Sequence, residues 1–269
     1  MNMFPAQPTP SFLTIYTHQL SECFKDFIEL AGISQLRDIS KKHKFYQALD
    51  YYFKHKNLNW RELQIPAHVL NLANDLASIV SLRYLIDVSS GGKPVKAFQR
   101  HELIETYIAE AMIITHFIQR GCNVFWPSIF NTDPPDIVIR DPNNQFSVDV
   151  EVKIKKRQGS IETMFDSFSK GLASLKSRRR ANDMSIIVVH NSDDLNWADW
   201  LSNPDVLQRL TSRLMTNDYK IVSGVVFSGG SEIKKDSIST GYSTKLVAFR
   251  SNAATHPLPY GFLTSSSNI

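Results

Sequence analysis

The sequence predicts an α/β protein in which a helical region is followed by a helix, three strands, a helix and a strand. Two observations predict this class. From residue 10 to residue 88, apolar residues recur at the spacing of helices. Beyond residue 100, amphipathic helical segments alternate with short Val- and Ile-rich runs bounded by Pro, Asp and Asn, a pattern typical of strands. The chain has 269 residues, 42% of them hydrophobic, which is enough for one large core or two ordinary ones.

The N-terminal region, residues 1–90, is predicted to be an all-helical accessory domain. Its helical segments are FLTIYTHQLSECFKDFIELAGI, FYQALDYYFKHKNL and IPAHVLNLANDLASIVSLRYLI. The following stretch SSGGKPVK combines paired Ser, paired Gly and a Pro, which predicts a linker at residues 91–96. DNA binding, contact with a partner protein and dimerisation all stay open as roles of the helical domain.

The second predicted domain, residues 97–269, begins with the amphipathic helix HELIETYIAEAMIITHFIQRG, and Gly121 suits a left-handed cap at its end. Three strands follow: CNVFWP, PDIVIR and FSVDVEVKIK. SIETMFDSFSKGLASLKSRR is then a helix with one apolar face, and SIIVVH is a buried strand. A helical segment near WADWLSNPDVLQRLTSRLM and the strands IVSGVVF and TKLVAF complete the domain.

The cysteine content and the N-terminus indicate a cytoplasmic protein. Cys23 and Cys122 are far apart and form no CxxC pair, which indicates a reducing compartment and buried structural thiols. The N-terminus lacks the basic and apolar regions of a secretory signal. No run of about 18 apolar residues is present to cross a bilayer, so we expect no membrane association.

The net charge is +4, and the basic residues gather at 41–44, 153–157 and 176–180. Each group is either the solvated end of a helix or strand or a contact to nucleic-acid phosphates. The segment KKHKFYQALDYYFKHKNLNWR interleaves cations with aromatic residues. Its aromatic residues also fit a buried helical stripe, which is the interpretation we prefer to DNA contact.

The segment PPDIVIRDPNNQFSVDVEVKIKK places charged residues among the apolar residues of two strands. Its Asp, Pro and Asn residues favour a tight turn centred between Asn143 and Asn144. Residues paired across the hairpin then have numbers that sum to 287, so Asp136 lies opposite Glu151. Because directly opposed residues share a face and alternation puts Lys153 on the same face as Glu151, the three charged groups are predicted to converge.

Two opposed carboxylates repel each other unless a cation lies between them, because directly opposed Cβ atoms are only about 4.5–5.5 Å apart. This geometry favours Mg²⁺, with Mn²⁺ as an alternative, since Mg²⁺ binds one or two carboxylates and keeps waters that phosphate oxygens replace. Lys153 is expected to orient the attacking water or to neutralise charge developing on the phosphate oxygens.

Pro135, Asp136, Glu151, Val152 and Lys153 resemble the motif of the PD-(D/E)XK nuclease superfamily. The order of elements from 101 to 190 is also similar to the restriction-endonuclease-like αβββαβ core of that family, with its mixed central sheet. The resemblance implies that Asp136 and Glu151 bind magnesium, that the Val152 carbonyl adds a ligand, and that Lys153 is catalytic. It covers roughly the middle third of the chain.

The family's first core helix often adds a glutamate to the metal site. By its distance to Gly121, Glu110 is the preferred catalytic and metal-binding glutamate here, ahead of Glu105 and Glu102. On the second core helix, Ser169 and Lys170 are candidates for a polar residue that points at the site. The Gln-x-x-x-Tyr pair that resembles the mark of the exonuclease branch is absent, which favours an endonuclease.

The resemblance implies a Mg²⁺-dependent endonuclease that hydrolyses DNA phosphodiester bonds in a restriction or defence role, with homodimerisation as one option. The nucleic-acid contacts are expected from Lys155, Lys156, Arg157 and Lys170. One alternative is a non-catalytic module on the same fold that binds nucleic acid or a partner protein. Another is a nuclease acting on RNA or branched DNA.

A second string, Pro204-Asp205 followed by Glu232-Ile233-Lys234, also fits the bare motif. We reject it because Asp205 opens a helix-like segment and Glu232 lies in SGGSEIKK, which is predicted to be a turn.

Overall fold

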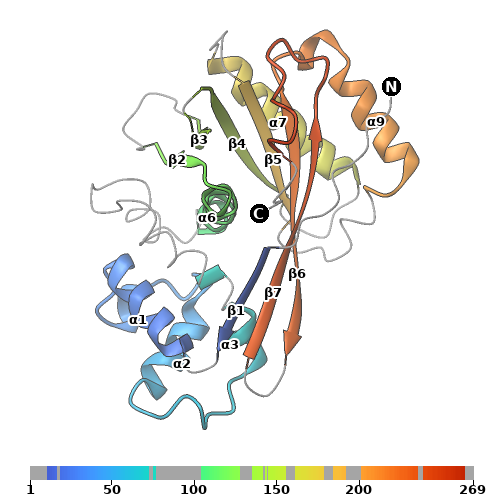
Figure 1. Ribbon diagram of the computed structural model, residues 1–269. Helices are drawn as coiled ribbons and strands as arrows, with labels where there is room; N and C mark the ends of the chain where they lie inside the picture. The colour runs from blue at the N-terminus through green and yellow to red at the C-terminus, as the bar shows by residue number, and fades with distance from the viewer. Residues whose placement is uncertain are drawn as a thin grey trace. The chain divides into compact units, whose positions relative to one another are not determined.

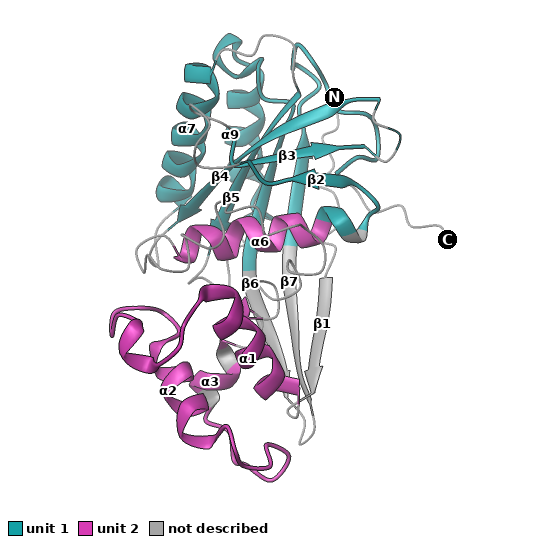
Figure 2. Ribbon diagram, turned by 90° about the vertical axis from the view of Figure 1, so that its left-hand side faces the viewer, with its two compact units in different colours: residues 1–11, 117–231, 244–269 teal, residues 12–116, 232–243 magenta. Residues whose placement is uncertain are grey.

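The computed structural model describes residues 11–16, 19–72, 75–76, 104–127, 135–141, 143, 145–155, 161–178, 184–191, 201–235 and 239–263 (Figure 1). The chain forms two compact units (Figure 2). Unit 1 comprises Met1–Ser11, Phe117–Ser231 and Thr244–Ile269, and unit 2 comprises Phe12–His116 and Glu232–Ser243. The predicted linker at 91–96 lies outside the described residues.

Unit 2 contains the helices α1 (Leu20–Ala31), α2 (Tyr46–His55) and α3 (Ala67–Asn71), the short 3-10 helix η2 (Leu36–Asp38), and α6 (Ile104–Gln119) as far as His116. Its core contains Phe24, Phe27, Phe45, Leu49 and Trp60, all 4% exposed or less. The aromatic residues of 41–61 therefore contribute to a buried core, as preferred from the sequence.

The basic group at 41–44 is partly taken up by contacts inside unit 2. Lys44 Nζ lies 2.6 Å from Asp75 Oδ2 and 3.3 Å from Glu105 Oε2. Burial disfavours the charged ammonium, but attraction to Asp75 and then Glu105 outweighs it and raises the pKa of Lys44. Lys44 therefore ties three segments of unit 2 together, and its partners are carboxylates.

The prediction that residues 10–88 are helical throughout was wrong at the start, because Ser11–Tyr16 form strand β1. The sequence SFLTIY is rich in β-branched and aromatic residues, which are common in strands. It has only six residues, with a single polar residue, Thr14, inside it, and over so short a stretch the apolar spacing of a helix cannot be told from that of a strand. In the sheet order β1 neighbours β7 (Ser239–Arg250), more than 200 residues later in the chain. Such a distant partner is not visible in local periodicity.

Unit 1 is an α/β unit whose mixed sheet has the order β7-β6-β5-β4-β3-β2. Its strands are β2 (Asn123–Phe125), β3 (Ile137–Arg140), β4 (Ser147–Lys155), β5 (Met184–Asn191), β6 (Gly224–Lys235) and β7. β2, β3 and β4 pair antiparallel, whereas β4, β5 and β6 pair parallel. The helices α7 (Ile161–Arg178) and α9 (Pro204–Leu214) and the 3-10 helix η4 (Asn217–Tyr219) complete the described elements.

The predicted order of helix, three strands, helix and strand is observed as α6, β2, β3, β4, α7 and β5. α6 also ends as predicted: Gly121 has a φ of 80°, and Cys122 N donates to Phe117 O at 3.1 Å. The prediction of a turn at SGGSEIKK was wrong, because this segment belongs to β6. Gly and Ser favour turns locally, but pairing within the sheet overrides that preference.

The β3–β4 hairpin has the predicted register. Ile137 pairs with Val150, and Val138 pairs with Asp149, so the numbers of paired residues sum to 287 as expected. The Asp141 side chain organises the turn by accepting hydrogen bonds from the backbone N–H groups of Asn143, Gln145 and Phe146. An Asp that satisfies several turn amides is a local device that fixes the loop and hence the register.

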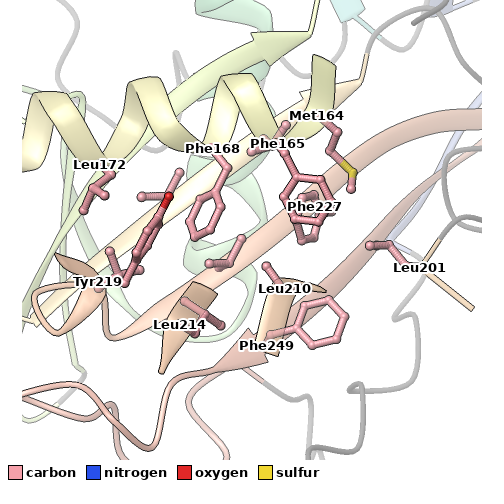
Figure 3. Packing of buried hydrophobic residues seen from close by; sticks show 14 of the residues in the cluster. Met164, Phe165, Phe168, Leu172, Leu201, Leu210, Leu214, Tyr219, Phe227 and Phe249 are labelled. Atoms are coloured by element: carbon pink, nitrogen blue, oxygen red, sulfur yellow. The ribbon is translucent and has the colours of Figure 1, made fainter. Parts of the chain in front are cut away.

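One hydrophobic core of unit 1 lies between the sheet and the helices α7 and α9. Met164, Phe165 and Phe168 project from α7 toward the sheet residues Phe227 and Phe249 (Figure 3). From α9, the guanidinium carbon atoms of Arg209 and Arg213 lie 4.7 and 4.5 Å from the centroid of the Phe165 ring. α7 is thereby fixed on one face of β5 and β6.

Gly171→Ala is expected to lower the free energy of unfolding by about 1–3 kcal/mol. At an exposed helix position, the change would stabilise the helix by about 1 kcal/mol. Here a Cβ would lie 2.6 Å from Cγ2 of Ile187, a fully buried β-branched residue with few alternative rotamers. Urea unfolding measures the effect, with Ala173→Gly on the exposed face of α7 as the control for helix propensity alone. A Gly171→Ala variant as stable as the wild type would contradict the close packing of α7 on β5.

Both cysteines are free thiols of intermediate exposure, so they are less buried than the sequence suggested. Burial, followed by the charges of Asp26 and Glu22, raises the pKa of the Cys23 thiol to about 11. In the part of the chain that the structure describes, none of the helices has the length and apolar character needed to cross a membrane.

Candidate active site at the β3–β4 hairpin

Asp136 lies at a bend directly before β3, where the ladder between β3 and β4 ends. Its Oδ2 accepts a hydrogen bond from the backbone N–H of Val152 at 2.8 Å. Val152 is only 3% exposed, so this N–H needs a protein acceptor. The Asp136 side chain thus takes the place of a strand carbonyl and is held against the backbone between Glu151 and Lys153.

Asp136→Ala is expected to cost about 1–3 kcal/mol of unfolding free energy, because it leaves the buried Val152 N–H without its acceptor. Asp136→Asn keeps an oxygen at that place and should cost about 0.5–1 kcal/mol, since a neutral acceptor replaces a charged one. Urea unfolding of the two variants measures the difference. Equal stability of the two variants would show that the bond to Val152 contributes nothing.

Glu151 is 1% exposed and both of its oxygens contact cations. Lys153 Nζ donates a hydrogen bond to Oε1, and Arg178 Nη1 lies 2.5 Å from Oε2. The side chains of Lys153 and Arg178 are 27% and 10% exposed. Within the described part of the chain Oε2 accepts no hydrogen bond, so the contact to Arg178 is an ion pair of poor directionality.

The sheet register explains why a carboxylate lies at this depth. Glu151 pairs with Ile187 and Lys153 with Val189, and both β5 residues belong to the core beneath α7 and α9. Glu151 and Lys153 therefore face the helix-covered side of the sheet. A charge is retained there only when it is paired, which the two cations accomplish.

The formal charges of Asp136 and Glu151 are balanced by those of Lys153 and Arg178. From the sequence, two nearby carboxylates were expected to require a metal ion. In the structure, side chains of the protein supply the opposite charge, so carboxylate repulsion alone does not require a metal. A divalent cation at this site would have to displace a side-chain cation from Glu151.

Arg178 was missed as a site residue because its sequence neighbours Lys176, Arg179 and Arg180 made it look like part of an exposed basic group. A signal was present in helical spacing. Position 178 continues the stripe formed by the buried residues Met164, Phe168, Gly171 and Leu175. An arginine that extends a buried stripe requires an anionic partner on the surface against which the stripe packs.

The predicted glutamates of the first core helix have three different outcomes. Glu110 lies on α6 in unit 2 and is 1% exposed, so it is not the solvated residue that was the alternative interpretation. Glu105 is paired with Lys44. Glu102 lies outside the described residues. Asp136, Glu151 and Lys153 belong to unit 1.

The residues predicted to contact nucleic acid differ in where the structure places them. Lys155 is 2% exposed, so its ammonium is not presented on a surface where a phosphate could meet it. Lys170 lies on the exposed face of α7, whereas Lys156 and Arg157 lie outside the described residues. Ser169 donates to Phe165 O and accepts a bond of 3.3 Å from Arg213, so its hydroxyl is used between α7 and α9.

Two carboxylates at the end of a hairpin fit Mg²⁺ or Mn²⁺, which take oxygen ligands and keep several waters. Asp136 and Glu151 would hold the ion, and Glu151 Oε2 retains unused hydrogen-bond acceptor capacity. Across the residues described here, no group of three or more His, Cys, Asp or Glu side chains is arranged to hold a metal. The contact seen at Val152 is through its N–H, whereas the predicted ligand was its carbonyl.

The geometry thus combines an Asp anchored to the backbone of β4 with a buried Glu and the two cations that pair it. No family model, curated protein or solved structure matches the chain.

Proposed function

We propose that this protein is a Mg²⁺-dependent nuclease of the PD-(D/E)XK type that hydrolyses DNA phosphodiester bonds. The observation that carries the proposal is the bond from Val152 N–H to Asp136, which holds this carboxylate beside the Glu151-Val152-Lys153 triplet. A chance match to the motif has no need to bring the remote Asp to the triplet. The order α6, β2, β3, β4, α7 and β5 is the order expected of the family's core.

In this proposal Asp136 and Glu151 hold the cation, which when bound acidifies a water and polarises the phosphate. Asp136 is preorganised for this role because the Val152 N–H fixes its orientation. Lys153 keeps its ammonium beside Glu151, where it neutralises charge that develops on the phosphate oxygens. Lys170 and the basic residues after β4 offer contacts to neighbouring phosphates. An endonuclease role in restriction or defence rests on the family resemblance.

Relaxation of a supercoiled plasmid tests the proposal. The wild type should nick or linearise the plasmid with Mg²⁺ or Mn²⁺ and should not do so with EDTA. Asp136→Asn should abolish cleavage while it preserves the bond to Val152. Asp205→Asn is the matched control, because it changes the Pro-Asp pair that begins α9. Absence of metal-dependent cleavage by the wild type on duplex DNA, branched DNA and RNA would refute the proposal.

The second candidate is a non-catalytic module that binds nucleic acid or a partner protein. The ion pairs of Glu151 with Lys153 and Arg178 favour it, because they satisfy the carboxylate without a metal. Calorimetric titration with Mg²⁺ separates the two candidates. Nucleic-acid binding without any heat of metal binding would favour the module, and a metal site lost in Asp136→Asn would favour the nuclease.

A further inference from the structure

Arg178 is the last described residue of α7, and its Nη1 lies 2.5 Å from Glu151 Oε2. In a helix the Cα–Cβ bond tilts toward the N-terminus, so a side chain in the last turn lies back along the helix. Gly171, two stripe positions earlier on α7, packs so closely on Ile187, the strand partner of Glu151, that an added Cβ would lie 2.6 Å from Cγ2 of Ile187. The long Arg178 side chain therefore returns along α7 to the level of Glu151.

We propose that Arg178 and the divalent cation compete for Glu151, and that cation binding releases the guanidinium to bind a phosphate oxygen of the substrate. This inference rests on the proposed function. It makes Arg178 a substrate-binding residue whose availability depends on the metal.

Competition follows from charge and geometry. A divalent cation and a guanidinium repel each other and cannot both lie against one carboxylate oxygen. Lys153 holds Oε1 through a hydrogen bond, whereas among the described residues Oε2 has the poorly directed contact to Arg178 and accepts no hydrogen bond. Oε2 is therefore the oxygen that an incoming cation takes most easily, and Arg178 is the group it displaces.

A released Arg178 has reason to bind a phosphate. The guanidinium is always charged and presents a planar set of donors that matches two phosphate oxygens. The two carboxylates and two side-chain cations cancel in formal charge, so the site gains an excess of two positive charges when a divalent cation binds. A phosphodiester anion is then attracted both by the cation and by the arginine displaced from Glu151. Metal and substrate are expected to strengthen each other's binding reciprocally.

Titration with Mn²⁺, in which the concentration of free ion is measured, tests the competition. Arg178→Met keeps the aliphatic stem but removes the charge, so it should bind Mn²⁺ about tenfold more tightly than the wild type, a change of about 1.4 kcal/mol. Arg178→Lys, which retains a point charge, should fall between the two. Arg213→Met is the matched control: Arg213 stacks on Phe165 and contacts Ser169, and its removal should leave Mn²⁺ affinity unchanged.

Binding of a short DNA duplex tests the release of Arg178. Both proteins carry Lys153→Met to prevent cleavage, and one also carries Arg178→Met. The additional change should weaken DNA binding about fivefold or more with Mn²⁺ and by less than about twofold without it, because Glu151 otherwise holds the arginine. An equal loss under both conditions would overturn the release.

The outcomes separate this inference from the proposed function. If the wild type and Arg178→Met bind Mn²⁺ equally, and Asp136→Asn weakens both, competition is disproved and the metal site stands. If neither binds Mn²⁺, the metal site and the inference fall together. Should Arg178→Met be too unstable to titrate, Arg178→Lys decides: an affinity equal to that of the wild type counts against competition, and a higher one supports it.

Discussion

Lys153→Met is expected to lower the rate of metal-dependent plasmid cleavage by about 10²–10³-fold, the loss typical for a group that stabilises transition-state charge. The ammonium lies against Glu151, the residue directly before Val152, whose backbone N–H holds the Asp136 carboxylate. Methionine keeps the length of the side chain and removes the charge. The Glu151 side chain is 1% exposed but keeps its contact to Arg178, so the loss of the Lys153 ion pair should cost about 1–3 kcal/mol of unfolding free energy.

The measurement is the initial rate of nicking at saturating Mg²⁺, with Lys220→Met as the control. Lys220 is an exposed lysine outside the three basic groups, and its replacement should leave the rate unchanged. Mn²⁺ affinity should survive in Lys153→Met, which distinguishes loss of catalysis from loss of the metal. A nicking rate of Lys153→Met within about threefold of the wild-type rate would remove the lysine from the proposed mechanism.

Glu151→Ala is expected to cost about 3–5 kcal/mol of unfolding free energy, the largest change in stability that we predict for a single substitution. It removes the carboxylate that neutralises Arg178, whose side chain is 10% exposed and cannot readily reach water. Lys153 can turn toward solvent more easily because it is more exposed. The cost thus arises mainly from the loss of the carboxylate beside the Arg178 guanidinium.

A double replacement provides the control for this prediction. When Glu151→Met and Arg178→Met are combined, no buried charge is left alone, so most of the lost stability should return. Urea unfolding of the two single variants and the double variant gives the coupling energy directly. Additive losses would mean that the ion pair does not exist in solution. This result does not depend on whether the protein is a nuclease.

The hairpin could be predicted in detail because its information is local. Asp141 and the Asn residues specify the turn, and period-2 alternation then fixes every pair, including Val138 with Asp149. The same reasoning placed Asp136 near Glu151. It did not reveal that Asp136 bonds to a backbone N–H, because the end of a strand ladder depends on where the neighbouring chain turns away.

Strands and ion pairs that form with residues far away in the sequence could not be predicted from local sequence patterns. β1 and the SGGSEIKK part of β6 pair within the sheet, whereas the local sequence of β1 does not distinguish a strand from a helix and that of SGGSEIKK favours a turn. The Glu151–Arg178 pair joins β4 to the far end of α7. From the sequence alone, an individual charged residue is expected to be exposed to solvent. The packing of the folded chain shows that Lys155 and Glu110 are buried.

The path of the chain between the two units has a practical consequence for dissecting this protein. Unit 2 takes residues 12–116 and then 232–243, so its boundaries fall inside α6, β6 and β7. A recombinant polypeptide ending near residue 90 would lack the parts of unit 2 that follow residue 90. One beginning at residue 97 would contain those parts of unit 2 but not residues 12–96. Dividing the gene there yields two halves suited to split-protein complementation rather than two autonomous folding modules.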